Sequence, residues 1–353
     1  MPIPPLYGHE GTRNRLVGAN ASGRLPQALL FEGPRGVGKQ RLALWLAQAL
    51  MCESPTKGAS GEGCGTCRPC RLVLNLSHPD VHWFVPLEPT KKAGDADKQV
   101  EAAEEALAEE MAARRERGLY EAASGLAIHS IAAMRLLLRR LVLTPAMAAR
   151  KVFVIGDAER LVPQVGTEAA ANALLKALEE PPAHTVFVLT TAAPEALLPT
   201  IRSRVVRVRV ASLADSVVAA FVQHELGLSE QRAIAQRVAL ADGCIGRVLA
   251  DGDRGDRGAE AAGRFVAAAE EGPARRYAFA LSQPPFQARG GFTDMLDGLV
   301  ERLRERARAG QETAVAVRAI AQVLEAKSLA QGNVNPQLVT AVLGSDWAAG
   351  DRA

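Results

Sequence analysis

The chain has 353 residues, of which 48% are hydrophobic and only 4% aromatic, and it carries a formal net charge of +3. That apolar content excludes a disordered chain, and the length predicts two or three domains. The near-balanced charge excludes a uniformly basic nucleic-acid coat, although it permits a local basic groove. No apolar run is long enough for a membrane span and the N-terminus has no leader pattern, so we expect a cytoplasmic protein that does not enter membranes.

The first predicted elements are a strand, a glycine-rich turn and a helix. The sequence LPQALLFEG, which ends at Gly33, reads as a short apolar strand, and helical apolar spacing begins at Lys39. Gly33, Gly36, Gly38 and Lys39 match G-x-x-x-x-G-K, a loop that attracts nucleotide phosphates through backbone N–H groups and the lysine charge. Gln40 stands where Ser or Thr normally binds magnesium. We predict an inherited nucleotide site and leave open whether it still binds ATP or ADP.

A cluster of cysteines follows this helix. Cys52, Cys64, Cys67 and Cys70 form two overlapping C-x-x-C steps with a fourth thiol nearby, a spacing typical of tetrahedral zinc sites. Four protein ligands leave no position for water, so we expect a structural zinc, with an iron–sulfur cluster as the alternative. The remaining cysteine, Cys244, is expected to be a small buried residue.

The middle of the chain alternates helices with apolar strands. Residues 88–120 are charged and Ala-rich, which favours a solvated helical insertion, with an acidic docking site as the alternative. Residues 128–141 predict an amphipathic helix bearing three arginines. Buried apolar strands are expected within 151–161 and 184–191, and a final alternating strand after the arginine pair of TIRSR, within 205–210. Buried strands separated by helices predict an α/β fold, with a parallel sheet covered by helices on both faces.

The strand that ends at Asp157 is followed by Ala158 and Glu159. In phosphate-loop ATPases one acid at this strand end binds magnesium and an adjacent glutamate activates water. Asp157 suits the first role, whereas Ala158 occupies the second place and cannot accept a proton. Glu159 is one residue further along, where strand alternation would turn its side chain away. We therefore expect no hydrolysis.

Arg204 lies in the sequence TIRSR, before the last predicted strand. It has two readings. An arginine at the edge of such a domain can stabilise the transition state on a nucleotide held by a neighbouring subunit, the role called an arginine finger. It can also be a surface arginine in a salt bridge, and on spacing alone the salt bridge is favoured.

Several blocks of this chain, taken in order, closely resemble the delta-prime subunits of bacterial DNA polymerase III clamp loaders, which belong to the AAA+ family. These blocks are GPRGVGK, CGTCRPC, HPDVHWF, DAERL, AANALLKALEEPP and LPTIRSR. The resemblance is strong over about residues 20–210 and looser beyond, mainly through NVNPQLVTAVL at 333–343.

The resemblance implies three domains. Residues 1–210 would form the AAA+ nucleotide-fold domain, with a zinc module at 52–70 and the charged insertion at 88–120. Residues 211–252, where the strand signal has ended, would form a helical lid, and residues 253–353 a helical collar that oligomerises.

The resemblance also implies a function. The chain would join delta and gamma/tau subunits in a hetero-pentamer that loads the sliding clamp on primed DNA within the DNA polymerase holoenzyme, a nucleotidyltransferase. It would be a rigid subunit and no enzyme on its own. Arg204 matches the arginine of the family's S-R-C motif, although Val205 replaces the cysteine, so the resemblance favours the arginine-finger reading. Gly246 falls about where ATP-hydrolysing relatives carry a lid arginine.

Two other functions are weighed against this one. A gamma/tau-like ATPase motor would need the groups that Gln40 and Ala158 replace. A zinc-ribbon module that binds primed DNA would suit a more basic chain, although the arginines of the 128–141 helix leave weak DNA contact open.

Overall fold

The computed structural model describes residues 3–55, 62–88, 95–117, 127–162, 168–249, 253–285, 291–308, 310, 313–331 and 334–350. It divides into two compact units, the first ending at Leu249 and the second containing the helices after it. The division into three domains at 210 and 252 stays a prediction.

The first unit is built on a five-stranded sheet in the order β2-β3-β4-β1-β5, in which all neighbouring strands are parallel. The strands are β1 (Ala28–Glu32), β2 (Val81–Phe84), β3 (Lys151–Ile155), β4 (Thr185–Thr191) and β5 (Val206–Arg209). Non-consecutive neighbours require helical crossovers, so the α/β fold with a parallel sheet predicted from the sequence is confirmed.

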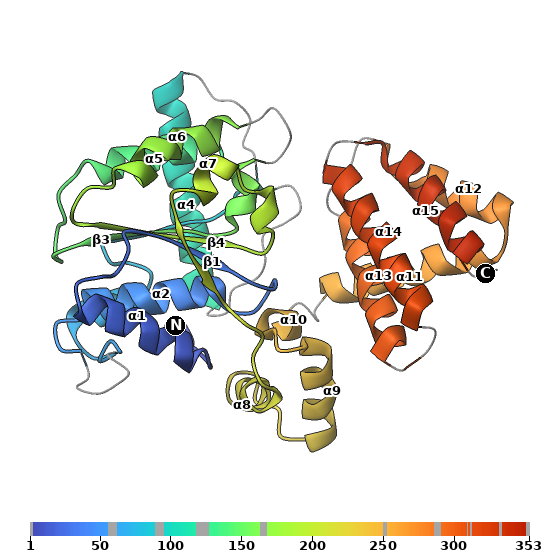
Figure 1. Cartoon of the computed structure of the whole chain (residues 1–353), viewed down its shortest axis with the longest axis horizontal. Helices are drawn as coiled ribbons and strands as arrows, with labels where there is room; N and C mark the ends of the chain where they lie inside the picture. Colours follow the sequence, from blue (N-terminus) through green and yellow to red (C-terminus); the bar gives the residue numbers. More distant parts are fainter. Residues whose placement is uncertain are drawn as a thin grey trace. The chain divides into compact units, whose positions relative to one another are not determined.

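Helices cover both faces of this sheet, with α1 and α2 on one face and α5, α6 and α7 on the other (Figure 1). The helices are α1 (Glu10–Ala21), α2 (Lys39–Met51), α3 (Arg68–Leu74), α4 (Ala96–Arg117), α5 (Ile131–Leu141), α6 (Ala169–Glu179) and α7 (Pro199–Arg202), with short 3-10 turns η1 (Ala158–Leu161) and η2 (Pro194–Ala196).

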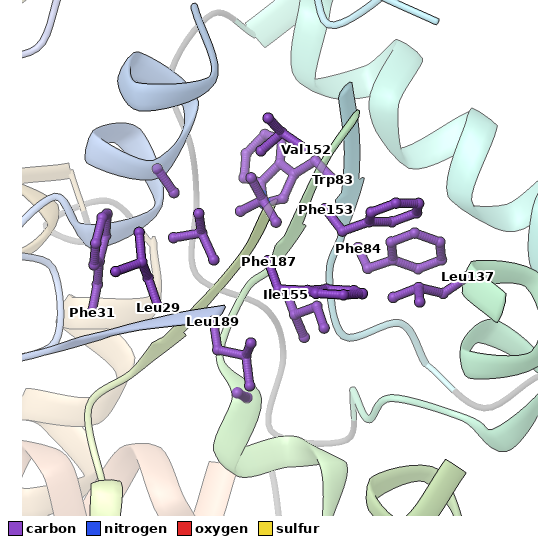
Figure 2. Close-up of a cluster of buried hydrophobic side chains, with 14 of the residues drawn as sticks. Leu29, Phe31, Trp83, Phe84, Leu137, Val152, Phe153, Ile155, Phe187 and Leu189 are labelled. Atoms are coloured by element: carbon purple, nitrogen blue, oxygen red, sulfur yellow. The ribbon is translucent and has the colours of Figure 1, made fainter. Parts of the chain in front are cut away.

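The main core lies between the sheet and these helices. Phe84, Phe153 and Phe187 gather on the side of Leu137 from α5 (Figure 2), and the rings of Phe153 and Phe187 stack with centroids 5.4 Å apart. These residues are almost completely buried. β1, β3 and β4 are buried along almost their whole length and read in sequence as continuous apolar runs, whereas the edge strand β5 is mostly exposed and alternates Val with Arg.

The charged insertion forms helix α4, but one side of it is packed. Val100 and Leu107 are buried and seven residues apart, so they share one face of the helix. Ion pairs join Asp97 to Arg139 and Glu104 to Arg140 of α5. The expectation of a helix is confirmed, whereas a fully solvated one is wrong, because α5 offers both an apolar surface and basic partners. Residues 89–94 and 118–120 lie outside the described residues.

Three short helices complete the first unit. They are α8 (Asp215–Glu225), α9 (Gln231–Ala241) and α10 (Ile245–Leu249). They have a small apolar core of their own, which includes Val218, Phe221 and Val222. Tyr7 from the N-terminal segment stacks edge-on against Phe221 and donates a hydrogen bond to Glu225, so the N-terminus ties these helices to the sheet domain.

The second unit is entirely helical within its described residues. Its helices are α11 (Asp253–Glu270), α12 (Pro273–Ser282), α13 (Gly291–Arg308), α14 (Thr313–Gln331) and α15 (Pro336–Gly350). They enclose a separate apolar core, where the rings of Phe265 and Trp347 meet edge to face. No helix among the described residues of the chain is long and apolar enough to cross a membrane.

A buried carboxylate fixes the loop between α5 and β3. Asp80, just before β2, accepts hydrogen bonds from the backbone N–H groups of Ala146, Met147 and Ala148 at 2.6, 2.7 and 2.8 Å. Burial acts to raise the pKa of Asp80, but the three N–H donors outweigh it and hold the pKa below its ordinary value of 3.8.

Asp80→Ala is expected to reduce the free energy of unfolding by about 2–4 kcal/mol, because three backbone donors lose a charged acceptor. Since folding lowers the pKa of Asp80, this stabilisation is complete above pH 3.8 and is lost as the pH falls further. Urea unfolding at neutral pH measures the loss. Asp80→Asn keeps one carbonyl acceptor and should lose less, and equal stability of wild type and Asp80→Ala would contradict the assignment.

Candidate functional site

The glycine-rich loop lies between β1 and α2, at the carboxyl edge of the sheet. Gly36 and Gly38 have positive φ angles of 82° and 100°, and Gly38 is the residue before the first turn of α2. Such angles favour glycine, which explains the sequence pattern. The strand–loop–helix order predicted from the sequence is confirmed.

The lysine of the loop is held by the loop itself. Lys39 Nζ donates to the carbonyl oxygens of Gly33 and Pro34 at 2.9 and 2.7 Å, and only 6% of the residue is exposed. Burial lowers the pKa of Lys39, while the carboxylates of Glu159 and Asp157 oppose that shift. The Lys39 ammonium group, which would attract a phosphate, is therefore already hydrogen-bonded to carbonyl groups of its own loop.

Gln40 is buried between α2 and the sheet. Its Oε1 accepts a hydrogen bond from the indole Nε1 of Trp83 at 3.0 Å. The glutamine amide also lies so close to Gly156, directly after β3, that a Cβ atom there would overlap it. The side chain that replaces the magnesium-binding hydroxyl thus packs between Trp83 and the end of β3.

Helix α10 packs directly on the loop. The N–H of Gly246 donates to the carbonyl oxygen of Gly36 at 2.8 Å, and a Cβ atom on Gly246 would lie 2.6 Å from the Gly36 Cα. No side chain fits at position 246 with this packing. Arg247, the next residue, pairs with Asp242 at 3.1 Å. On the other side of the loop, the His9 ring nitrogen Nε2 lies 2.9 Å from the Val37 carbonyl oxygen.

Acidic residues lie at the same edge of the sheet. Asp157 has a left-handed backbone, and its N–H donates to Thr190 Oγ1 at 3.1 Å. Glu159 accepts from the N–H of Ala192, just after β4, and burial followed by the charge of Asp157 raises the Glu159 pKa. The expectation that Glu159 points away from this edge is wrong, because η1 is a 3-10 turn and strand alternation does not continue through it. Ala158 is completely buried.

Arg204 lies at the opposite edge of the sheet. Because β1 and β5 are parallel, with Leu29 beside Val206 and Glu32 beside Arg209, Arg204 lies at the amino ends of the strands. The glycine-rich loop begins after Glu32, which lies about 16 Å from the level of Arg204 along the strand direction. Arg204 therefore cannot serve the phosphate loop of its own chain.

The Arg204 side chain is partly exposed and makes an ion pair. Its Nε and Nη2 donate to Glu179 Oε2 at 3.1 and 2.9 Å, and its Nη1 donates to the Thr200 carbonyl at 2.9 Å. The sequence does not predict the role of Glu179, because nothing in the local pattern AANALLKALEEPP links it to an arginine 25 residues later.

The four predicted thiols come together. The sulfur atoms of Cys52, Cys64, Cys67 and Cys70 all lie within 4.8 Å of one another, and those of Cys52 and Cys67 are 4.0 Å apart. Tetrahedral zinc with bonds of about 2.3 Å requires sulfur atoms about 3.8 Å apart, so the cluster fits such an ion. Backbone N–H groups of Cys64 and Cys67 point at neighbouring sulfurs, an arrangement that favours thiolates.

One thiol of the cluster is already acidic. The Thr66 hydroxyl, together with the N–H groups of Cys67 and Thr66, lowers the Cys64 pKa to about 6. Burial instead raises the pKa of Cys52 and of Cys70, so the four thiols differ in acidity. Four sulfur donors at this spacing suit a metal that binds sulfur. Cys244 lies outside the cluster and is buried, as predicted.

A solved structure of similar arrangement is a DNA polymerase III gamma subunit-related protein from Thermotoga maritima. It is 17% identical, with coverage of 97% of this chain and 99% of that one and a TM-score of 0.42.

Several curated relatives are DNA polymerase III subunits. Subunit delta' of Escherichia coli is 30% identical over 236 residues, which is 67% of this chain and 57% of that protein. Subunit delta' of Pseudomonas aeruginosa is 34% identical over 180 residues, 51% of this chain and 42% of the relative. Subunit gamma/tau of Mycobacterium bovis is 30% identical over 199 residues, 56% of this chain and 27% of the relative.

These matches thus span between 27 and 57% of the relatives' own lengths. The family described as "DNA polymerase III, delta subunit" matches residues 8–214, which include the phosphate loop, the cysteine cluster and Arg204. The chain therefore belongs to the DNA polymerase III delta-subunit family, and delta-prime subunits are among its relatives.

Proposed function

We propose that the chain is the delta-prime subunit of a DNA polymerase III clamp loader. It acts in the cytoplasm within a hetero-pentamer of delta and gamma/tau subunits that places the sliding clamp on primed DNA. Its sheet domain is an AAA+ domain, α8–α10 its lid, and α11–α15 the collar through which it assembles. The family match over residues 8–214 and the delta' relatives support this role.

In this proposal the chain hydrolyses no ATP. The observation that supports this most directly is that the side chains of the glycine-rich loop are hydrogen-bonded within the chain itself. Lys39 donates to the carbonyl oxygens of Gly33 and Pro34, and Gln40 accepts from Trp83. A nucleotide would have to displace the lysine from two carbonyls and the packed helix α10 from Gly36. Ala158 also offers no group to activate water.

Arg204 would instead serve the ATP site of an adjacent subunit. Its position at the edge opposite the chain's own phosphate loop supports a role in trans. A guanidinium placed against the phosphates of bound ATP stabilises the negative charge that builds up during transfer. The chain thereby contributes to an ATPase reaction that it does not perform.

Cys52, Cys64, Cys67 and Cys70 would bind one structural zinc ion. Sulfur donors suit zinc, and four of them leave no open position for a substrate. The zinc would join Cys52, directly after α2, to Cys70 within α3.

The purified chain is expected to turn over no ATP in the presence of magnesium. Its rate should equal that of Lys39→Ala, measured side by side by phosphate release. The alternative, a gamma/tau-like ATPase motor, is supported most strongly by Glu159, because the charge of its carboxylate favours the protonated form of Lys39 and acts to raise the Lys39 pKa. Turnover that is lost in both Lys39→Ala and Glu159→Gln would favour a gamma/tau-like ATPase over the proposal.

A further inference from the structure

The ion pair between Arg204 and Glu179 is built from two separate elements. Glu179 is the last residue of α6, and Arg204 follows α7. One carboxylate oxygen, Glu179 Oε2, accepts from both Nε and Nη2 of Arg204. The Thr200 carbonyl and, at 3.4 Å, the Ser203 hydroxyl accept from Nη1. The guanidinium is therefore held down against the ends of α6 and α7.

Glu179 is an unfavourable residue for its own helix. The carboxyl end of a helix carries partial negative charge, so an acid in its last turn is destabilising and a base is preferred. The Glu179 side chain is 58% exposed and that of Arg204 is 28% exposed, so burial does not explain the residue either. The ion pair with Arg204 compensates for the unfavourable negative charge of Glu179 at the carboxyl end of α6.

We propose that Glu179 is a positioning residue that holds Arg204 in a resting orientation and competes with the phosphate of a nucleotide on the neighbouring subunit. This inference rests on the proposed function of Arg204. When the neighbour brings a phosphate to this edge, the guanidinium exchanges the carboxylate for phosphate oxygens. Without a neighbour, the pair keeps the arginine ordered and its charge neutralised.

The pair is suited to such an exchange because it is weak and accessible. Two donors share a single carboxylate oxygen, so the pair lacks the two-oxygen geometry of strong arginine–carboxylate contacts. Exposed ion pairs contribute little free energy. Removing the Glu179 carboxylate should therefore raise the effective affinity of Arg204 for phosphate by only about two- to fivefold. A phosphate, with more charge and more acceptor oxygens, replaces it at little cost.

The test uses the assembled clamp loader with clamp and primed DNA, carrying the chain as wild type, Glu179→Gln, Arg204→Ala or the double variant. Glu179→Gln keeps the shape of the side chain and removes its charge. We expect its kcat/KM for ATP to rise about two- to fivefold, the range set by an exposed ion pair. Glu180→Gln, the matched change one residue on, should leave kcat/KM unchanged. In the Arg204→Ala background, Glu179→Gln should have no effect.

A second measurement tests the resting contact in the isolated chain. Modification of Arg204 by phenylglyoxal, followed by peptide mass spectrometry, should be about two- to fivefold faster in Glu179→Gln than in wild type or Glu180→Gln. A merely structural role of Glu179 would lower kcat/KM or leave it unchanged, and either result overturns the inference.

The two proposals fail in different ways. If Arg204→Ala leaves the ATPase rate unchanged, the arginine has no role in trans and both proposals fall. If Arg204→Ala lowers the rate while Glu179→Gln behaves as wild type, only the inference about Glu179 is rejected.

Discussion

Arg204→Ala is expected to reduce turnover at the ATP site that it faces in the assembled complex by about a thousandfold or more, the range seen when an arginine finger is removed. The reason is that a guanidinium placed against the transferring phosphate stabilises the negative charge of the transition state, and alanine has no charge to do so. The measurement is the DNA-stimulated ATPase of the reconstituted complex, together with clamp loading on primed DNA.

The matched control is Arg207→Ala, which removes another exposed arginine three residues along the chain. Arg207 lies in β5, pairs with Glu32 of β1 and is largely exposed to solvent. Its loss should leave the ATPase within about twofold of wild type, as expected for a surface pair. Gel filtration should show intact complexes for both variants, so that a lost rate cannot be ascribed to lost assembly. An unchanged ATPase in an intact Arg204→Ala complex would contradict the trans role.

Cys67→Ser is expected to release the zinc ion. Structural zinc sites contribute about 10–16 kcal/mol in total, so one thiolate of four accounts for about 3 kcal/mol and more than a hundredfold in affinity. Metal analysis of the native protein should find one zinc per chain, and the variant should lose it on dialysis. The sheet core should remain, since its cluster of buried residues does not include Cys67.

The control for the zinc site is Cys244→Ser, because Cys244 is buried outside the cluster. This variant should keep its zinc. Limited proteolysis should cut the Cys67→Ser chain near the cysteines and leave the Cys244→Ser chain intact there. Native protein without zinc, or with iron and sulfide in its place, would contradict the assignment.

The features predicted correctly are those carried by local pattern. Apolar runs bounded by turn residues predicted β1, β3 and β4 but not the short β2, and the spacing of Gly36, Gly38 and Lys39 predicted the glycine-rich loop between β1 and α2. The C-x-x-C spacing fixed which thiols meet, because the chain between Cys64 and Cys70 is too short to separate them widely.

The features that sequence reasoning missed depend on contacts between distant segments. The Trp83 indole meets Gln40 across 43 residues, and Glu179 meets Arg204 across 25. The orientation of Glu159 was wrong for another reason: the backbone changes from strand to 3-10 turn at that point. No periodicity in a single sequence specifies such pairings or the place of such a change.

The contact between Gly36 and Gly246 constrains how this protein can be altered. An arginine at position 246 would push helix α10 away from the loop, since even a Cβ atom there overlaps the Gly36 backbone. Under the proposed function, a variant designed to hydrolyse ATP would need α10 moved away from the loop as well as new side chains at Gln40 and Ala158.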